Sequence, residues 1–80
     1  MLWHIEFDGQ FKQTLQKANL KPFQKEALLK AINTVATFEN PLDHGGKYHD
    51  HWGYRFGKNS ILHCNIDIKR NVIIIFGVTF

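Results

Sequence analysis

The sequence predicts an α+β fold of two layers, in which a helical hairpin covers one face of a sheet. Three observations lead to this prediction. Apolar residues alternate with polar ones near the start of the chain and again in its second half, which is typical of strands. Between these stretches the apolar residues recur at helical spacing. A chain of 80 residues has room for one core, so residues 1–80 are expected to form a single domain.

The first half of the chain predicts one strand followed by two helices. Trp3–Phe7 alternates apolar and polar residues, and Asp8 is placed to cap the short helix that follows. Pro22 suits the first turn of a longer helix, which should end before Pro41 because the residue preceding a proline disfavours the α region. Two helices joined by so short a break are expected to be antiparallel.

The second half predicts three strands. Trp52–Phe56 and Ser60–Ile68 are strands separated by the turn-forming segment Gly57–Asn59, and Lys69–Asn71 separates them from a third strand, Val72–Val78. Such short turns make these strands antiparallel neighbours. The expected order is therefore one strand, two helices, and a three-stranded antiparallel meander, with the first strand added to the same sheet.

A polar, glycine-containing segment, Pro41–Asp50, is expected to be a loop that leads into the meander. Polar side chains with useful chemistry are concentrated in this loop and on the polar face of the following strands. They are His44, Lys47, His49, His51, Arg55 and His63.

Composition limits the compartment and the partners. A hydrophobic fraction of 44% is that of a globular chain, and the formal charge of +3 suits a phosphate-rich or acidic partner. The single cysteine, Cys64, has no partner for an internal disulfide. The chain begins without a signal-peptide pattern, and its longest apolar run is too short to cross a bilayer. We therefore expect a cytoplasmic protein with no membrane partner.

Metal-free cleavage of RNA needs a base for the 2′-hydroxyl, cations for the phosphate and an acid for the leaving oxygen. Arg55 suits the phosphate because the planar guanidinium bonds two oxygens. His49 and His51 would share one face of an extended segment and are candidates for base and acid. His63, on the polar face of the neighbouring strand, is a fourth candidate for the catalytic set; the alternative is that these histidines are solvated or packing residues.

Further side chains are candidates for contacts with RNA. Lys47 and Lys58 suit phosphate contacts, because the ordinary pKa of lysine is too high for proton transfer near neutrality. His44 could add to this surface. Tyr48, Tyr54 and Trp52 could stack on an extruded base, although a core position is the favoured alternative for Trp52.

A zinc site is the alternative use of the histidines. The spacing His44-x4-His49-x-His51 matches no structural zinc pattern, and Cys64 falls on the apolar face of its strand. We therefore expect neither a metal nor another cofactor.

The order of elements and several short motifs resemble the RelE/ParE superfamily of toxins from type II toxin–antitoxin systems. The motifs are the opening strand, the lysine-rich helical hairpin that ends at Asn40-Pro41, the segment Gly53–Leu62, and the apolar closing strand. The histidine-bearing loop before Trp52-Gly53-Tyr54-Arg55 is similar to the YafQ branch.

The resemblance implies a ribosome-dependent mRNA endonuclease, an mRNA interferase, that inhibits translation. It also implies three partners, namely the ribosome, mRNA and a cognate antitoxin protein that holds the toxin inactive. Of the family's arginines, Arg55 is the one that matches well.

Two other functions remain open at this point. One is a ParE-like inhibitor of DNA gyrase, which would be a binding protein; the histidine cluster favours the nuclease, because binding needs no acid–base pair. The other is a degenerate member that only binds antitoxin or RNA, suggested by Ser60 and the C-terminal residues, which depart from the family pattern.

Overall fold

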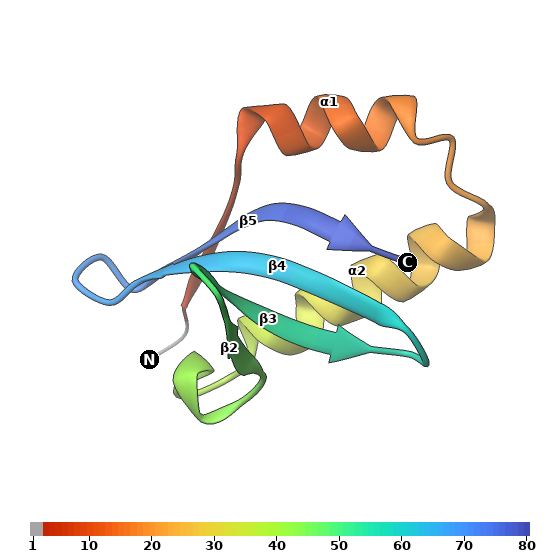
Figure 1. Cartoon of the computed structure of the whole chain (residues 1–80). Coiled ribbons are helices and arrows are strands. Elements are labelled where there is room, and N and C mark those ends of the chain that lie inside the picture. The colour runs from red at the N-terminus through yellow and green to blue at the C-terminus, as the bar shows by residue number, and fades with distance from the viewer. Residues whose placement is uncertain (1–2) are drawn as a thin grey trace.

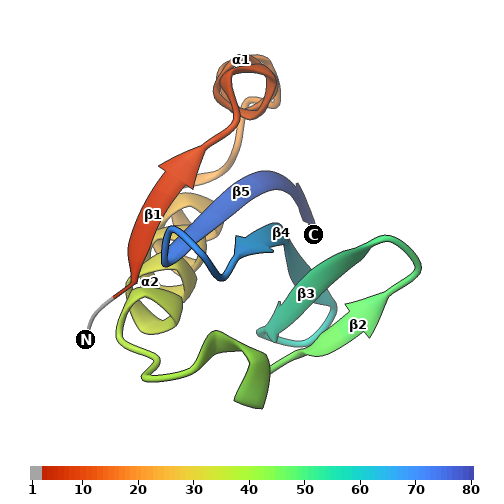
Figure 2. The same cartoon turned by 90° about the vertical axis from the view of Figure 1, so that its left-hand side faces the viewer.

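The computed structural model describes residues 3–80 and contains one mixed five-stranded sheet with two helices (Figure 1). The elements in chain order are β1 (His4–Phe7), α1 (Gly9–Lys17), α2 (Pro22–Ala36), a 3-10 helix (Pro41–Asp43), β2 (Gly46–Tyr48), β3 (His51–Phe56), β4 (Ser60–Asp67) and β5 (Val72–Thr79). The strands lie in the order β1-β5-β4-β3-β2 (Figure 2). β1 is parallel to β5, and every other neighbouring pair is antiparallel. The predicted α+β class is confirmed.

The sheet has one strand more than the sequence predicted. The segment Pro41–Asp50, expected to be a loop, contains the 3-10 helix and the edge strand β2. The prediction of a loop is wrong because β2 has no alternation of apolar and polar residues to reveal it. β2 instead pairs with the start of β3, so that Gly46 lies opposite Gly53 and Tyr48 lies opposite His51.

Both helices begin where their capping residues predict. The Asp8 carboxylate accepts a hydrogen bond from the backbone N–H of Gln10 at 2.9 Å, and Pro22 occupies the first turn of α2. The chain reverses direction between α1 and α2 (Figure 1). Within residues 3–80, neither helix is long and apolar enough to cross a membrane.

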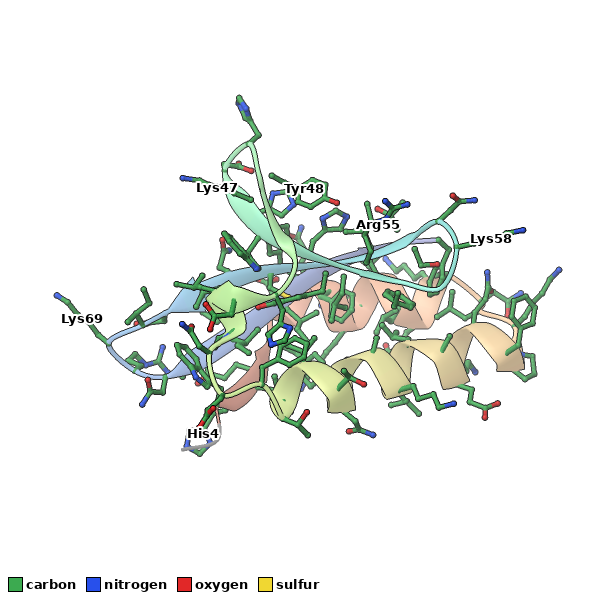
Figure 3. All side chains as sticks on the ribbon, turned by 90° about the horizontal axis from the view of Figure 1, so that it is seen from below. His4, Lys47, Tyr48, Arg55, Lys58 and Lys69 are labelled. Atoms are coloured by element: carbon green, nitrogen blue, oxygen red, sulfur yellow. The ribbon has the colours of Figure 1, made fainter. Side chains whose placement is uncertain are left out.

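One core joins the helices to the sheet. Both helices lie on the same side of the sheet, and the labelled side chains of Tyr48 and Arg55 lie on the other side (Figure 3). The residues that form the buried cluster come from both helices and from β3, β4 and β5: Phe11, Leu28, Val35, Tyr54, Leu62, Cys64, Ile73 and Ile75. Among residues 3–80 no helix covers the opposite face of the sheet, which is called the open face below.

A β-bulge interrupts the pairing of β4 with β5. His63 lies opposite Gly77, whereas the next residue, Cys64, lies opposite Ile75, so Phe76 is the extra residue. Because the bulge inserts one residue into β5, apolar side chains on both sides of it can face the core. Phe76 itself is left on the exposed side of the sheet, next to His63.

Leu28 and Leu29 are adjacent on α2 but differ in burial, so substituting each of them tests which face of the helix packs into the core. Leu28 is 5% exposed and Leu29 is 61% exposed. Leu28→Ala is expected to lower the free energy of unfolding by about 2–5 kcal/mol, because it leaves a cavity in the core. Leu29→Ala is the matched control and is expected to cost less than about 0.5 kcal/mol. Chemical denaturation measures both, and equal losses would contradict this assignment of the core.

Candidate functional site

The open face gathers polar side chains from β3 and β4. Alternation along β3 puts His51 and Arg55 on the same face, and the register places His63 of β4 opposite Gly53, midway between them. The same register places Ile61 opposite Arg55. The fold therefore brings together three of the four predicted catalytic residues.

A continuous chain of hydrogen bonds crosses this face from the β2–β3 turn to β5. The Asp50 carboxylate lies 2.9 Å from Nδ1 of His51, and Nε2 of His51 lies 2.8 Å from Nδ1 of His63. Nε2 of His63 lies 2.8 Å from the Thr79 hydroxyl. All four ring nitrogens of the two histidines are thereby engaged.

Aromatic rings surround the histidine pair. The Tyr48 ring stacks on His51 with ring centres 5.5 Å apart and meets His63 edge-on. Phe76 approaches His51 from β5, with ring centres 5.2 Å apart. Gly53 makes this arrangement possible, because a Cβ atom there would overlap the Tyr48 ring. The rings exclude part of the water from the pair and leave its outer edge open.

The surroundings change the ionisation of two groups in the chain. Partial burial, together with the neighbouring His51, lowers the pKa of His63 below its usual value. The hydrogen bond from His51 lowers the pKa of the exposed Asp50 carboxyl group. Near neutral pH the chain of hydrogen bonds thus begins at an ionised Asp50 carboxylate and contains a neutral His63 imidazole.

Arg55 is exposed on the open face (Figure 3). Residues placed diagonally across an antiparallel pair, as Arg55 and His63 are, have Cα atoms roughly 7–8 Å apart, within reach of a long side chain. Its guanidinium makes a long hydrogen bond of 3.5 Å to the backbone oxygen of Lys58 in the β3–β4 turn. So weak a contact leaves the guanidinium able to bond an incoming phosphate beside the histidine pair.

Other predicted residues lie away from the histidine pair. His49 is exposed in the two-residue turn between β2 and β3, so it does not share a face with His51, as an extended segment would have required. His44 stacks on Phe38, with ring centres 3.8 Å apart, at the groove between α2 and β3. The chain of hydrogen bonds includes neither His49 nor His44.

Tyr54 belongs to the core. It is 5% exposed, and its hydroxyl donates a 2.7 Å hydrogen bond to the backbone oxygen of Pro41. Burial raises the pKa of Tyr54 above its usual value. A ring held in this way is not available to stack on RNA, so the exposed aromatic candidate beside the histidines is Tyr48. Trp52 is half-buried against the core, the position favoured for it from the sequence. Its indole N–H donates a 2.8 Å hydrogen bond to the backbone oxygen of His44.

Lys47 and Lys58 are both exposed and lie near opposite ends of β3 (Figure 3). Lys47 lies opposite Trp52 in β2, so alternation directs its side chain to the other face from Tyr48. Lys58 lies in the turn after β3, next to Arg55. Of the two lysines, Lys58 is thus the one positioned to add positive charge beside the site.

The geometry of possible metal ligands differs from that of a zinc site. Within the described part of the chain, residues 3–80, no three His, Cys, Asp or Glu side chains converge on one point. Cys64 lies on the core side of β4, and burial raises the pKa of its thiol to about 12. A protonated, buried thiol is a poor ligand and a poor nucleophile.

Two residues of the chain of hydrogen bonds were not among the predicted site residues. Asp50 could have been found from its position directly before His51, since a carboxylate is a common partner of a histidine. Thr79 gives no such signal, because its role depends on the bulge and on the register of β5 against β4.

Neither the models of known protein families nor the curated proteins contain a match to this chain.

The lowered pKa of His63 makes the stability of the fold depend on pH. Below the ordinary histidine pKa of about 6.5 the unfolded chain takes up the proton more readily than the folded one, so folding is favoured less. We expect the free energy of unfolding to fall as the pH drops from about 7 to about 5, and to fall less in His63→Gln. His49→Gln, in the exposed turn, is the control. Denaturation curves that show equal losses in His63→Gln and wild type would contradict this.

Proposed function

We propose that this protein is a toxin of a type II toxin–antitoxin system that cuts mRNA on the ribosome. The observation that carries the proposal is the hydrogen-bonded pair His51 and His63, held on an exposed face beside Arg55. This arrangement supplies proton-transfer groups and a phosphate-binding cation at one place, which a metal-independent ribonuclease requires.

The chemistry that the pair supports is transfer of the phosphoryl group to the neighbouring hydroxyl. His63 takes the proton of the 2′-hydroxyl, and the 2′-oxygen bonds to phosphorus. The bond from phosphorus to the 5′-oxygen breaks, and water protonates that oxygen. The products are a 2′,3′-cyclic phosphate and a free 5′-hydroxyl, while Arg55 bonds the phosphate oxygens on which negative charge increases.

Exposure of the site agrees with a requirement for the ribosome. Arg55 is exposed and Tyr48 is half-buried beside the histidine pair, so the site lies on an open surface of the sheet. Optimal alignment of the 2′-oxygen, the phosphorus and the leaving oxygen must then come from the surface that presents the mRNA. A ribosome holding mRNA in its decoding site would supply that geometry.

The RelE/ParE-like arrangement of elements is part of the same proposal. The order of β1, the two helices and the meander β3–β4–β5 along the chain supports this part of the proposal. β2 is an addition to that order, and it is the element that holds Tyr48 and leads into Asp50. In this proposal the hairpin formed by β2 and β3 completes the proton-transfer site.

Arg55→Ala is expected to lower the rate of mRNA cleavage by about 10²–10³-fold and to abolish growth arrest upon induced expression, because one preorganised donor to the phosphate is lost. Arg55→Lys should restore little, since an ammonium lacks the two-pronged geometry. Mapping of mRNA ends after induction measures cleavage, and codon-phased cuts are expected for the wild type.

Arg70→Ala is the matched control for Arg55→Ala. Arg70 lies in the β4–β5 turn and forms an exposed ion pair with Glu6 at 2.8 Å, which contributes at most about 1 kcal/mol. Its loss should leave growth arrest unchanged. A folded Arg55→Ala variant that remains fully toxic would overturn the proposed mechanism, and double-strand DNA breaks in place of mRNA cuts would favour gyrase inhibition.

The cognate antitoxin is expected to be a small protein with an acidic segment that covers the face bearing Arg55 and Lys58. The net charge of +3 and the exposure of both residues are the physical reason. Co-expression with neighbouring genes should yield a stable complex whose rate of association falls as salt is added. Purification from the native operon without a second small protein would count against this partner.

A further inference from the structure

The order of donors and acceptors along the chain of hydrogen bonds is determined from its Asp50 end. An ionised carboxylate has no hydrogen to donate, so Nδ1 of His51 must carry the hydrogen of the 2.9 Å contact. In neutral His51, Nε2 is then an acceptor. Its partner at 2.8 Å, Nδ1 of His63, must therefore be the donor.

The same reasoning extends to the far end of the chain. A neutral His63 that carries its hydrogen on Nδ1 has a lone pair on Nε2. That lone pair accepts the hydrogen of the Thr79 hydroxyl at 2.8 Å. The Asp50 carboxylate thus determines which nitrogen of His63 is basic, and it does so through His51.

We propose that Asp50 is a positioning residue that acts through His51 to keep Nε2 of His63 as the proton-accepting atom of the site. This inference rests on the proposed ribonuclease function. The Thr79 hydroxyl occupies the position that the 2′-hydroxyl of RNA takes when it binds, since both are donors to the same nitrogen.

The proton then has a defined route. When Nε2 of His63 takes the hydrogen of the substrate hydroxyl, Nδ1 of His63 passes its own hydrogen to Nε2 of His51. The positive charge thereby moves to His51, beside the Asp50 carboxylate, and His63 becomes neutral with its hydrogen on Nε2. Water that protonates the leaving oxygen yields hydroxide, which takes up the extra proton and returns the pair to its starting state.

The pair can hold only one extra proton without losing its central bond. With two, hydrogens on Nε2 of His51 and Nδ1 of His63 would face each other across 2.8 Å. The groups that surround the pair do not relieve this conflict. The hairpin formed by β2 and β3 contributes the Asp50 carboxylate, the Tyr48 phenol and the Arg55 guanidinium. β5 contributes Phe76 and Thr79, whose side chains do not titrate.

Asp50→Asn removes the constraint that fixes which atoms donate and which accept along the chain of hydrogen bonds. An amide can donate as well as accept, so it also permits a His51 that carries its hydrogen on Nε2. His63 must then donate from Nε2 to Thr79, and its basic nitrogen is lost. Replacement of a buried orienting carboxylate by an amide lowers turnover by about 10⁴-fold in serine proteases. Asp50 is exposed, so we expect a loss of about 10–100-fold.

Proton–nitrogen correlation NMR of the free protein tests the inference without any RNA. At a pH well above the ordinary pKa of histidine, the wild type should show His51 and His63 with hydrogen on Nδ1. Asp50→Asn should shift both toward hydrogen on Nε2, and Asp50→Glu should restore the wild-type pattern. Asp43→Asn, an exposed aspartate in the 3-10 helix, is the control and should change nothing.

The two possible failures are distinguishable. Wild-type His63 with its hydrogen on Nε2, or an Asp50→Asn variant with an unchanged pattern, would overturn the role of Asp50. The expected patterns in a protein that does not cut mRNA would overturn the proposed function and leave the tautomer assignment supported. The expected patterns, together with slower cleavage by Asp50→Asn than by Asp50→Glu, would support both.

Discussion

Complete burial of one row of side chains in β4 and β5 is the constraint on which the rest of the molecule depends. Leu62, Cys64, Ile73 and Ile75 have no exposed surface and pack against α1 and α2. Because side chains alternate between faces, a shift of one residue in either strand would move this row into water. Hydrophobic burial therefore determines the register, and the register determines which polar residues meet on the open face.

The chain from Asp50 to Thr79 is a consequence of that register combined with one irregularity. Each of its members comes from a different turn or strand, and their distances match only while β3, β4 and β5 keep their alignment. The bulge at Phe76 changes the spacing along β5 by one residue, so that Ile75 and the partly buried Val78 both pack against the core while Thr79 still reaches His63. A change in the alignment of β5 beyond the bulge would move Thr79 away from His63 and interrupt the chain of hydrogen bonds.

The sequence was sufficient for features that repeat along the chain or depend on local chemistry. Alternation and helical spacing predicted both helices and four strands, and Asp8 and Pro22 marked helix starts correctly. β2 was missed because glycine and charged residues conceal a strand that exists only by pairing with β3. The grouping of His51 with His63 was partly foreseen, whereas Thr79 could not be, since no local pattern encodes a contact across a bulge.

The parallel pairing of β1 with β5 has a consequence for how the protein is made. His4–Phe7 aligns with Val72–Ile75, so the first strand of this sheet to be synthesised cannot pair until its fifth strand is available. The loop closed by this pairing contains nearly the whole chain, and contacts of such long range form slowly. On a translating ribosome the sheet stays incomplete until β5 has left the exit tunnel. A partner that binds the folded sheet would consequently find its target only after β5 has joined β1.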